Sequence, residues 1–349
     1  MAHIAQTTSQ TTAQIMRELG LRYVGIDELT IRRKRNGTGF IYTNGRGRRL
    51  RDERTLYRLK RLAVPPAYID VVYAPDPSAH LQAVGRDSAG RAQYRYHPNW
   101  EQVRELRKAQ RLAKLVHLLP RIRTWVTRHL RSTEPNRDLA LAAVIELVTV
   151  SALRPGSEAY ARQHGTRGAT TLHKSDVLIG AGIVMLKFPG KGGKRIEKEI
   201  KSARLVHALT VLRRLPGKRL FQYRNDDGVV CRLRRRDVNA GLKAMTGRSI
   251  TLKDFRSLIG SALALEDLAA LEPKQSARGR RRQILATMRR VAEELANTPA
   301  VCRRSYVHAA VVEAFESGRL RKMAGKHRSL RPAARRERML ANILRAMQG

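Results

Sequence analysis

The chain has 349 residues, 42% of them hydrophobic, and carries 70 Lys and Arg against 29 Asp and Glu, a formal net charge of +41. A charge of this size repels itself unless a polyanion shares the surface, so nucleic acid is the expected partner. Aromatic residues are only 5% of the chain, which argues against a stacking platform for single strands and favours binding to duplex phosphates. The cysteines, Cys231 and Cys302, exclude a disulfide framework and a CxxC zinc site.

Residues 1–16 are polar and rich in Thr and Gln, which predicts a loose leader. They lack the basic start and the apolar segment of a secretory signal. The longest apolar run, residues 139–153, is interrupted by Glu146 and is too short to span a bilayer. We therefore expect no membrane partner and a cytoplasmic protein.

Turn signals such as Asn36-Gly37 and Asn44-Gly45 punctuate residues 17–98 and separate short runs rich in β-branched and aromatic residues. These runs predict strands, with a helix near residues 53–62. The segment is expected to form a small β-rich domain.

Gln93, Tyr94, Arg95 and Tyr96 alternate along one of these expected strands. Alternation sends Gln93 and Arg95 to one side of a sheet and the two tyrosines to the other. The tyrosines have two interpretations, as part of a binding surface or as core aromatics of a small sheet.

The pattern becomes helical after residue 98. Residues 100–118 carry apolar side chains at helical spacings, and residues 139–153 are apolar nearly all round, which predicts a buried helix. Alternating apolar residues before a glycine-rich turn predict a β-hairpin over residues 183–200. Helical periodicity returns for the rest of the chain.

Thr298 and Pro299 are suited to cap and begin a helix near the end of this region. Tyr306 is expected about two turns into that helix, and Gly318 is expected to end it.

Together these patterns predict an α+β fold. A small β-rich N-terminal domain would cover residues 17–98, and a larger, mainly helical domain with a β-hairpin would cover residues 99–318. Residues 319–349 would form a basic C-terminal tail, in which apolar residues from Met339 to Met347 indicate a short helix.

Several familiar motifs are absent. The segment from Gly190 to Lys194 is glycine- and lysine-rich, but it lacks the spacing of a phosphate-binding loop. The ten histidines include no HExxH, and no acidic cluster has the spacing of a two-metal nuclease. We therefore do not expect a nucleotide-hydrolysing motor. We expect a mechanism that uses neither a metal site nor a cofactor.

Tyr306 is the candidate nucleophile. A free phenol has a pKa of about 10 and needs positive surroundings to react as phenolate. Phosphoryl transfer otherwise asks a protein to hold the phosphate and balance its charge, for which arginine is well suited. Arg154, Lys191, Arg256 and Asn297 precede Tyr306 in the chain and supply such groups.

Each of these residues also has a purely structural interpretation. Arg154 follows a buried helix, where a cation is favoured in any case. Lys191 on a glycine turn is ordinarily solvated, Asn297 suits a left-handed helix end, and Arg256 could pair with a carboxylate. Tyr306 could be an amphipathic core residue.

The order Arg, Lys, Arg, Asn, Tyr, within its local contexts, resembles the type IB DNA topoisomerases, specifically their bacterial, poxvirus-like branch. The blocks that carry the resemblance are residues 64–71, 85–100, 151–161, 170–177, 253–256 and 297–306. The resemblance implies relaxation of supercoiled duplex DNA through a 3′-phosphotyrosyl intermediate, strand rotation and religation, without ATP, metal or small-molecule cofactor. It also implies a monomer of the recombinase and topoisomerase fold type, associated with the nucleoid.

Residue by residue, the resemblance makes Tyr306 the nucleophile, Arg154 and Arg256 the phosphate ligands and Lys191 the general acid for the 5′ oxygen. Asn297 stands where viral and eukaryotic relatives carry histidine. An amide can donate a hydrogen bond but carries no charge, so a weaker contribution is expected there.

The resemblance also implies that the segment from Gln93 to Tyr96 meets the major groove of DNA, where glutamine and arginine suit base edges. Lys253 is a further expected DNA-binding residue. Two other functions remain open: a site-specific tyrosine recombinase, whose second arginine usually follows a histidine by three residues where this chain has Lys253, and a non-catalytic basic DNA-binding protein.

Overall fold

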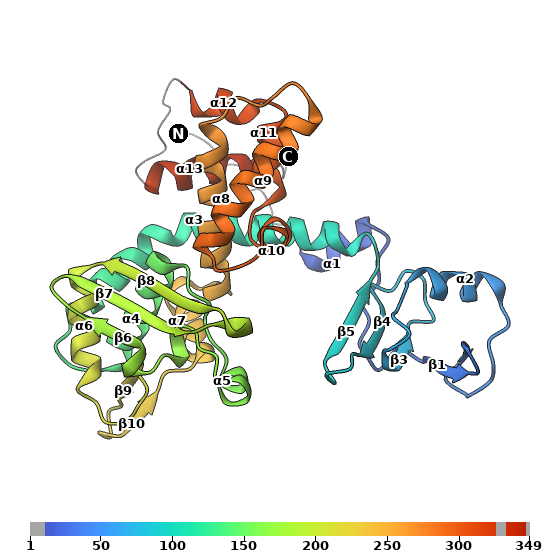
Figure 1. Ribbon diagram of the computed structural model, residues 1–349, viewed down its shortest axis with the longest axis horizontal. Helices are drawn as coiled ribbons and strands as arrows, with labels where there is room; N and C mark the ends of the chain where they lie inside the picture. The colour runs from blue at the N-terminus through green and yellow to red at the C-terminus, as the bar shows by residue number, and fades with distance from the viewer. Residues whose placement is uncertain (1–10, 326–332, 347–349) are drawn as a thin grey trace. The chain divides into compact units, whose positions relative to one another are not determined.

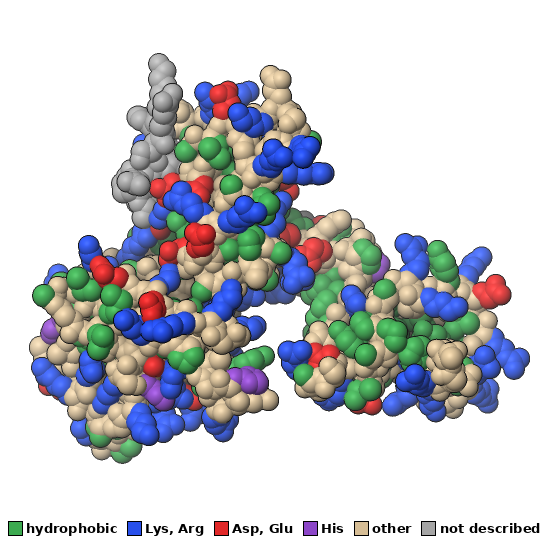
Figure 2. Space-filling model, viewed as in Figure 1, with side chains coloured by type: hydrophobic (Ala, Val, Ile, Leu, Met, Phe, Trp, Pro, Cys, Tyr) green, Lys and Arg blue, Asp and Glu red, His purple; other side chains and the backbone are tan. Residues whose placement is uncertain are grey.

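The structure is a computed structural model that describes residues 11–325 and 333–346 (Figure 1). The chain divides into two compact units, residues 1–108 and 109–349. The boundary therefore falls beyond residue 98, where the sequence pattern changes from strands to helices. On the face drawn in Figure 2, Lys and Arg side chains are spread over both units.

The N-terminal unit is an antiparallel sheet with two short helices, followed by the first residues of a long third helix. Its strands lie in the order β2-β1-β3-β4-β5, with β5 at an edge. The elements are α1 (Thr12–Glu18), β1 (Ile31–Asn36), β2 (Gly39–Thr43), α2 (Glu53–Arg61), β3 (Ile69–Tyr73), β4 (Leu81–Arg86), β5 (Ala92–Tyr96) and α3 (Trp100–His129). The predicted strands and the predicted helix near residues 53–62 are confirmed.

Helix α1 corrects the prediction of a loose leader for residues 12–16; residues 1–10 lie outside the described part of the chain. Thr11 caps the helix by accepting a hydrogen bond from the backbone N–H of Gln14 at 3.2 Å. Ile15 and Met16 are buried in one cluster with Val103 of α3. The helix is held by this apolar contact, which the Thr- and Gln-rich composition does not reveal.

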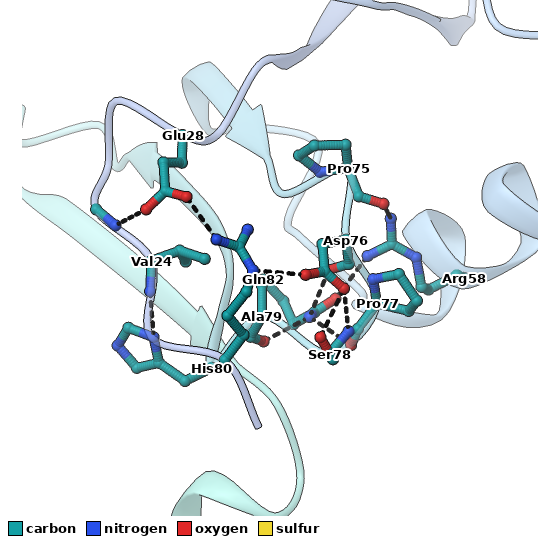
Figure 3. A network of polar contacts seen from close by, with 12 residues as sticks. Val24, Glu28, Arg58, Pro75, Asp76, Pro77, Ser78, Ala79, His80 and Gln82 are labelled. Atoms are coloured by element: carbon teal, nitrogen blue, oxygen red, sulfur yellow. Dashed lines mark hydrogen bonds and ion pairs between the residues drawn. The ribbon is translucent and has the colours of Figure 1, made fainter. Parts of the chain in front are cut away.

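A polar network fixes the connection between β3 and β4 (Figure 3). Asp76 accepts hydrogen bonds from Arg22 Nε at 2.7 Å and from the hydroxyl of Ser78 at 2.7 Å. Arg58 of α2 donates to Gln82 Oε1 at 2.6 Å. Arg22 and Ser78 hold the pKa of Asp76 near 2, with Ser78 making the larger contribution, so the carboxylate stays ionised at neutral pH.

The C-terminal unit is mainly helical and contains two small sheets (Figure 1). Besides the rest of α3, its helices are α4 (Arg137–Ser151), α5 (Glu158–His164), α6 (Ala203–Arg213), α7 (Arg235–Thr246), α8 (Leu252–Ala269), α9 (Ala277–Glu294), α10 (Pro299–Ser305), α11 (Ala309–Glu316), α12 (Arg319–Ala324) and α13 (Ala333–Arg345). Its strands and single turns of 3-10 helix are η1 (Ala169–Thr171), η2 (Lys174–Asp176), β6 (Val177–Ile179), β7 (Ile183–Pro189), η3 (Lys191–Gly193), β8 (Arg195–Lys201), β9 (Gln222–Arg224) and β10 (Val230–Arg232).

Helix α4 is the centre of the core, and the prediction that it is buried nearly all round is confirmed. It packs against α6, α7 and α8 and against the sheet β6-β7-β8. Its buried acid, Glu146, forms an ion pair with Arg204 at 2.7 Å. Pairing offsets the cost of burying that carboxylate.

The predicted hairpin is present as β7 and β8, whose residues pair from Ile183↔Lys201 to Pro189↔Arg195. Two features were not predicted: β6 as a third strand of this sheet, and the separate ladder of β9 and β10. The three strands concerned have only three residues each, too few for an alternating pattern to be recognised.

The expected helix from Thr298 to Gly318 is broken, which corrects the position predicted for Tyr306. Thr298 caps α10 and Pro299 begins it, as predicted, but the helix ends at Ser305 and Tyr306 lies in the bend before α11. Ser261 of α8 holds this bend: its hydroxyl donates to the Tyr306 carbonyl at 3.1 Å and accepts from the His308 N–H at 3.0 Å.

The segment predicted as a basic tail packs on the C-terminal unit where it is described. α12 and α13 contact α8 and α11, and Met339, Leu340, Ile343 and Leu344 of α13 are buried. Arg123 of α3 forms two hydrogen bonds to the carboxylate of Glu337, at 2.9 and 2.6 Å. The predicted helix near Met339 is confirmed; Met347 lies outside the described residues.

Candidate active site

A pocket of about 430 Å³ in the C-terminal unit collects most of the predicted catalytic residues. Its lining residues are Arg154, Pro155, Gly156, Ser157, Tyr160, Thr166, Arg167, Lys191, Arg235, Asn239, Thr251, Leu252, Lys253, Arg256 and Tyr306. Six of them are cationic and none is acidic. The pocket is therefore suited to a polyanion.

Arg154 reaches the pocket because α4 ends just before it. Ala152 adopts the left-handed conformation with φ of 53°, which turns the chain out of the helix. The guanidinium of Arg154 donates to the carbonyl of Ala296 at 3.1 Å and to the side-chain oxygen of Asn297. The left-handed residue at the end of α9 is Ala296, with φ of 48°, so the interpretation of Asn297 as a left-handed helix end is wrong.

Asn297 does not line the pocket but holds Arg154 beside it. Its side-chain nitrogen is buried and makes no hydrogen bond of good geometry to a described residue. This nitrogen is a donor available to an acceptor that enters the site.

Arg256 is buried with a side chain of 1% relative exposure. Its guanidinium donates to the carbonyl of Ala152 and, at 2.9 Å, to the carbonyl of Leu295. No described carboxylate pairs with it, so the ion-pair interpretation is wrong. Its Nε is also buried without a partner among the described residues. A buried cation with no described carboxylate partner is expected to receive an anion.

The ring of Tyr306 lies against Arg256, with 4.9 Å between the guanidinium carbon and the ring centroid. Burial by itself raises the pKa of Tyr306, but Arg256, with smaller contributions from Arg154 and Asn297, outweighs burial and lowers the pKa below its ordinary value. The phenolate is therefore easier to form here than in water.

Lys191 stands at the start of η3, on the loop between β7 and β8, with an exposed side chain. Gly192 and Gly193 have φ of 73° and 74°, which favours glycine at both positions. A Cβ on Gly190 would lie 2.7 Å from the Ile196 side chain, so glycine is also favoured there. The loop presents Lys191 to the same pocket as Arg154, Arg256 and Tyr306.

The predicted DNA-binding residues of the N-terminal unit lie on the edge strand β5. Tyr94 and Tyr96 are 44% and 41% exposed and stack with ring centroids 6.2 Å apart, so their interpretation as core aromatics is wrong. Arg95 donates to the carbonyl of Ala63 at 2.9 Å, and Gln93 donates to Asp87 at 2.9 Å.

Strand register shows which residues share a face of this sheet. Arg95 belongs to the row that continues through Ala83, Tyr73 and Ile31, which is buried with Leu59 of α2. Tyr94 belongs to the neighbouring row of Val84, Val72 and Arg32, on the opposite face. The tyrosine face thus carries exposed aromatic and cationic side chains together.

Sequence reasoning missed several residues of the pocket, notably Arg167, Arg235 and Tyr160. No periodicity distinguishes the two arginines from the many other cations of the chain, and Tyr160 lies in the block of residues 151–161 but was given no role. The geometry as a whole, a cation-lined pocket that contains a tyrosine, is suited to an enzyme whose substrate is a polyanion.

Comparison with known proteins specifies the family. Residues 97–332 match the catalytic core of eukaryotic DNA topoisomerase I, and residues 39–87 match the N-terminal domain of bacterial DNA topoisomerase IB. DNA topoisomerase 1B of Acanthamoeba polyphaga mimivirus is 30% identical over 294 residues, which cover 82% of this chain and 88% of that protein. DNA topoisomerase 1B of Vaccinia virus (strain Copenhagen) is 24% identical over 264 residues, 73% of this chain and 80% of that protein.

The chain belongs to the type IB DNA topoisomerases, enzymes that relax DNA. This membership confirms the resemblance drawn from the sequence. It sets aside both the recombinase and the non-catalytic DNA-binding protein.

Proposed function

We propose that this protein relaxes supercoiled duplex DNA by cutting one strand through a 3′-phosphotyrosyl bond to Tyr306, letting the free end rotate, and rejoining the strand. The observation that carries the proposal is the buried guanidinium of Arg256, which lies 4.9 Å from the Tyr306 ring and lacks a described carboxylate partner. The positive charge of such a group activates the phenol and also binds the phosphate.

The cleavage step conserves atoms and charge. Tyr306 first loses its phenol proton to solvent. The phenolate oxygen then attacks the scissile phosphorus and displaces the 5′ oxygen, to which Lys191 gives a proton, so that a 5′ hydroxyl leaves. Arg154 and Arg256 balance the charge on the non-bridging oxygens, with Asn297 as a neutral donor. Religation is the reverse: the 5′ hydroxyl attacks the phosphotyrosine, its proton returns to Lys191, and Tyr306 is released.

We propose further that the reaction needs neither ATP nor a divalent metal. One phosphodiester is exchanged for another, so no external free energy enters the balance. The charge that develops on the phosphate can be balanced by the arginines and lysine of the pocket. We also propose that the enzyme acts as a monomer on the nucleoid in the cytoplasm, with the N-terminal sheet and the pocket bound to the same duplex.

Plasmid relaxation in EDTA without ATP tests this mechanism. Tyr306→Phe should abolish relaxation and leave duplex binding nearly intact, because it removes the attacking oxygen and no phosphate contact. Tyr223→Phe, which changes a partly buried tyrosine outside this pocket, is the matched control and should relax normally. Trapping with denaturant should leave the 3′ end of one strand on a peptide that contains Tyr306. Relaxation by Tyr306→Phe, or a requirement for metal, would contradict the mechanism.

A further inference from the structure

We propose that Arg167 is a positioning residue that keeps the loop of Lys191 in register with Arg154, so that the general acid and the phosphate ligand act on the same phosphodiester. The proposal rests on the function proposed above for Lys191. Arg167 lines the pocket together with both residues.

The backbone after Thr166 bridges the two parts of the site. On one side, the N–H of Arg167 donates to the carbonyl of Pro189, two residues before Lys191, at 2.8 Å. On the other side, the N–H of Ala169 donates to the carbonyl of Arg154 at 2.8 Å. A segment of three residues thus connects the backbone of the phosphate ligand to the loop of the general acid.

The centre of this bridge is tightly packed. A Cβ on Gly168 would lie 2.5 Å from the carbonyl oxygen of Arg154 and 2.6 Å from the nitrogen of Gly156. Gly156 itself has φ of 92°, a conformation that strongly favours glycine. The two chain segments are therefore in direct backbone contact.

The side chain of Arg167 anchors the bridge to the neighbouring sheet. Its Nε lies 3.1 Å from the carboxylate of Asp176, and its terminal nitrogen lies 3.0 Å from Nδ1 of His173. Asp176 is almost fully buried and also accepts from the His173 N–H at 2.7 Å. Val177, the next residue, pairs with Leu186 on β7, the strand that leads to Lys191.

These partners determine the role of Arg167. The positive charge of Arg167 is balanced by Asp176, whereas that of Arg256 has no described carboxylate partner. Arg167 is therefore less suited than Arg256 to bind the phosphate. Removing the side chain releases one end of the bridge and loosens the Lys191 loop. The leaving-group step should therefore suffer more than the binding of the phosphate.

A substrate with sulfur at the bridging 5′ position distinguishes these effects, because a thiolate leaves without a proton from the enzyme. Single-turnover cleavage by the full-length enzyme is measured on the oxygen and sulfur duplexes. Arg167→Ala should slow cleavage of the oxygen duplex by about 10- to 100-fold, which is part of the roughly 10²- to 10⁴-fold acceleration that a general acid gives. The same variant should cleave the sulfur duplex near the wild-type rate. Asp176→Asn, which keeps the arginine but weakens its anchor, should show a smaller defect that sulfur also restores.

Arg213→Ala is the matched control, because Arg213 also donates to a carbonyl of this sheet, that of Val177 at 3.3 Å, but does not line the pocket. It should be normal on both duplexes. Equal slowing of Arg167→Ala on both duplexes, an unchanged rate on the oxygen duplex, or the same sulfur-restored defect in Arg213→Ala would each overturn the proposal. Failure of the underlying function is seen separately, as a Lys191→Ala variant that sulfur does not restore.

Discussion

Among the side chains around Tyr306, Arg256 has the largest effect on its ionisation. Burial raises the pKa of the phenol, and Arg256, with smaller contributions from Arg154 and Asn297, lowers it by a larger amount. The net effect favours phenolate below the ordinary phenol pKa.

We predict that Arg256→Gln raises the pKa of Tyr306 above the ordinary value of about 10, because burial then acts with less opposition. NMR of enzyme with 13C at the tyrosine ζ carbon reports each phenol during a pH titration, and the spectrum of Tyr306→Phe identifies the resonance. A pKa unchanged by Arg256→Gln would show that this guanidinium does not control the nucleophile.

A second prediction ranks the phosphate ligands. Arg154→Ala and Arg256→Ala should both reduce single-turnover cleavage severely, and Asn297→Ala should reduce it less, because charge-assisted hydrogen bonds are roughly twice as strong as neutral ones. Asn297 also accepts a hydrogen bond from Arg154, which keeps a second acceptor in the carbonyl of Ala296. A defect in Asn297→Ala as deep as that of either arginine variant would contradict the ranking.

The elements position Tyr306 through a bend rather than through a continuous helix. Ser261 is fully buried in α8 and bonds to the backbone on both sides of the bend, at Tyr306 and His308. A buried N–H that loses its acceptor costs about 1–3 kcal/mol. Helix α8 also carries Arg256, so one helix places both the nucleophile and the cation that activates it.

We therefore predict that Ser261→Ala destabilises the protein by about 1–3 kcal/mol in urea unfolding and also slows cleavage, because the bend loses both contacts. Ser261→Thr, which keeps the hydroxyl, should retain more of the cleavage rate. Duplex binding should change little in either variant. A loss of stability with a fully normal rate of cleavage would mean that the bend does not position Tyr306.

At the scale of the whole molecule, the net charge of +41 contributes to DNA binding only where cationic side chains contact phosphates. In the N-terminal unit the face of the sheet that carries Tyr94 also carries exposed Arg32, while α2 packs on the opposite face. Lys34, two residues along β1 from Arg32, is also exposed on that face.

The fourth prediction follows from this arrangement. Arg32→Ala and Lys34→Ala should each weaken duplex binding and reduce the slope of log affinity against log salt by about 1, because one phosphate contact is lost. Lys60→Ala, on α2 over the other face, is the matched control and should leave the slope unchanged. Equal effects of all three variants would show that the sheet face has no special role.

Local patterns in the sequence were enough to predict much of the fold and to choose four candidate residues that share a pocket. The apolar run of α4, the glycine-rich turn that contains Lys191 and the capping pair Thr298-Pro299 each depend on neighbouring residues, and each was predicted correctly. Arg154, Lys191, Arg256 and Tyr306 were chosen for their chemistry and order, and they line one pocket.

Only the tertiary structure decided how these residues are held. Ser261 breaks the helix at Tyr306 from 45 residues away, and Arg256 reaches the carbonyl of Ala152 across 104 residues. The segment of residues 167–169 connects two loops through backbone hydrogen bonds, to which any residue except proline can contribute its N–H. Periodicity depends only on residues that are close together along the chain. These contacts join distant segments through backbone N–H and carbonyl groups, which nearly all residues have, so they leave no pattern in the sequence.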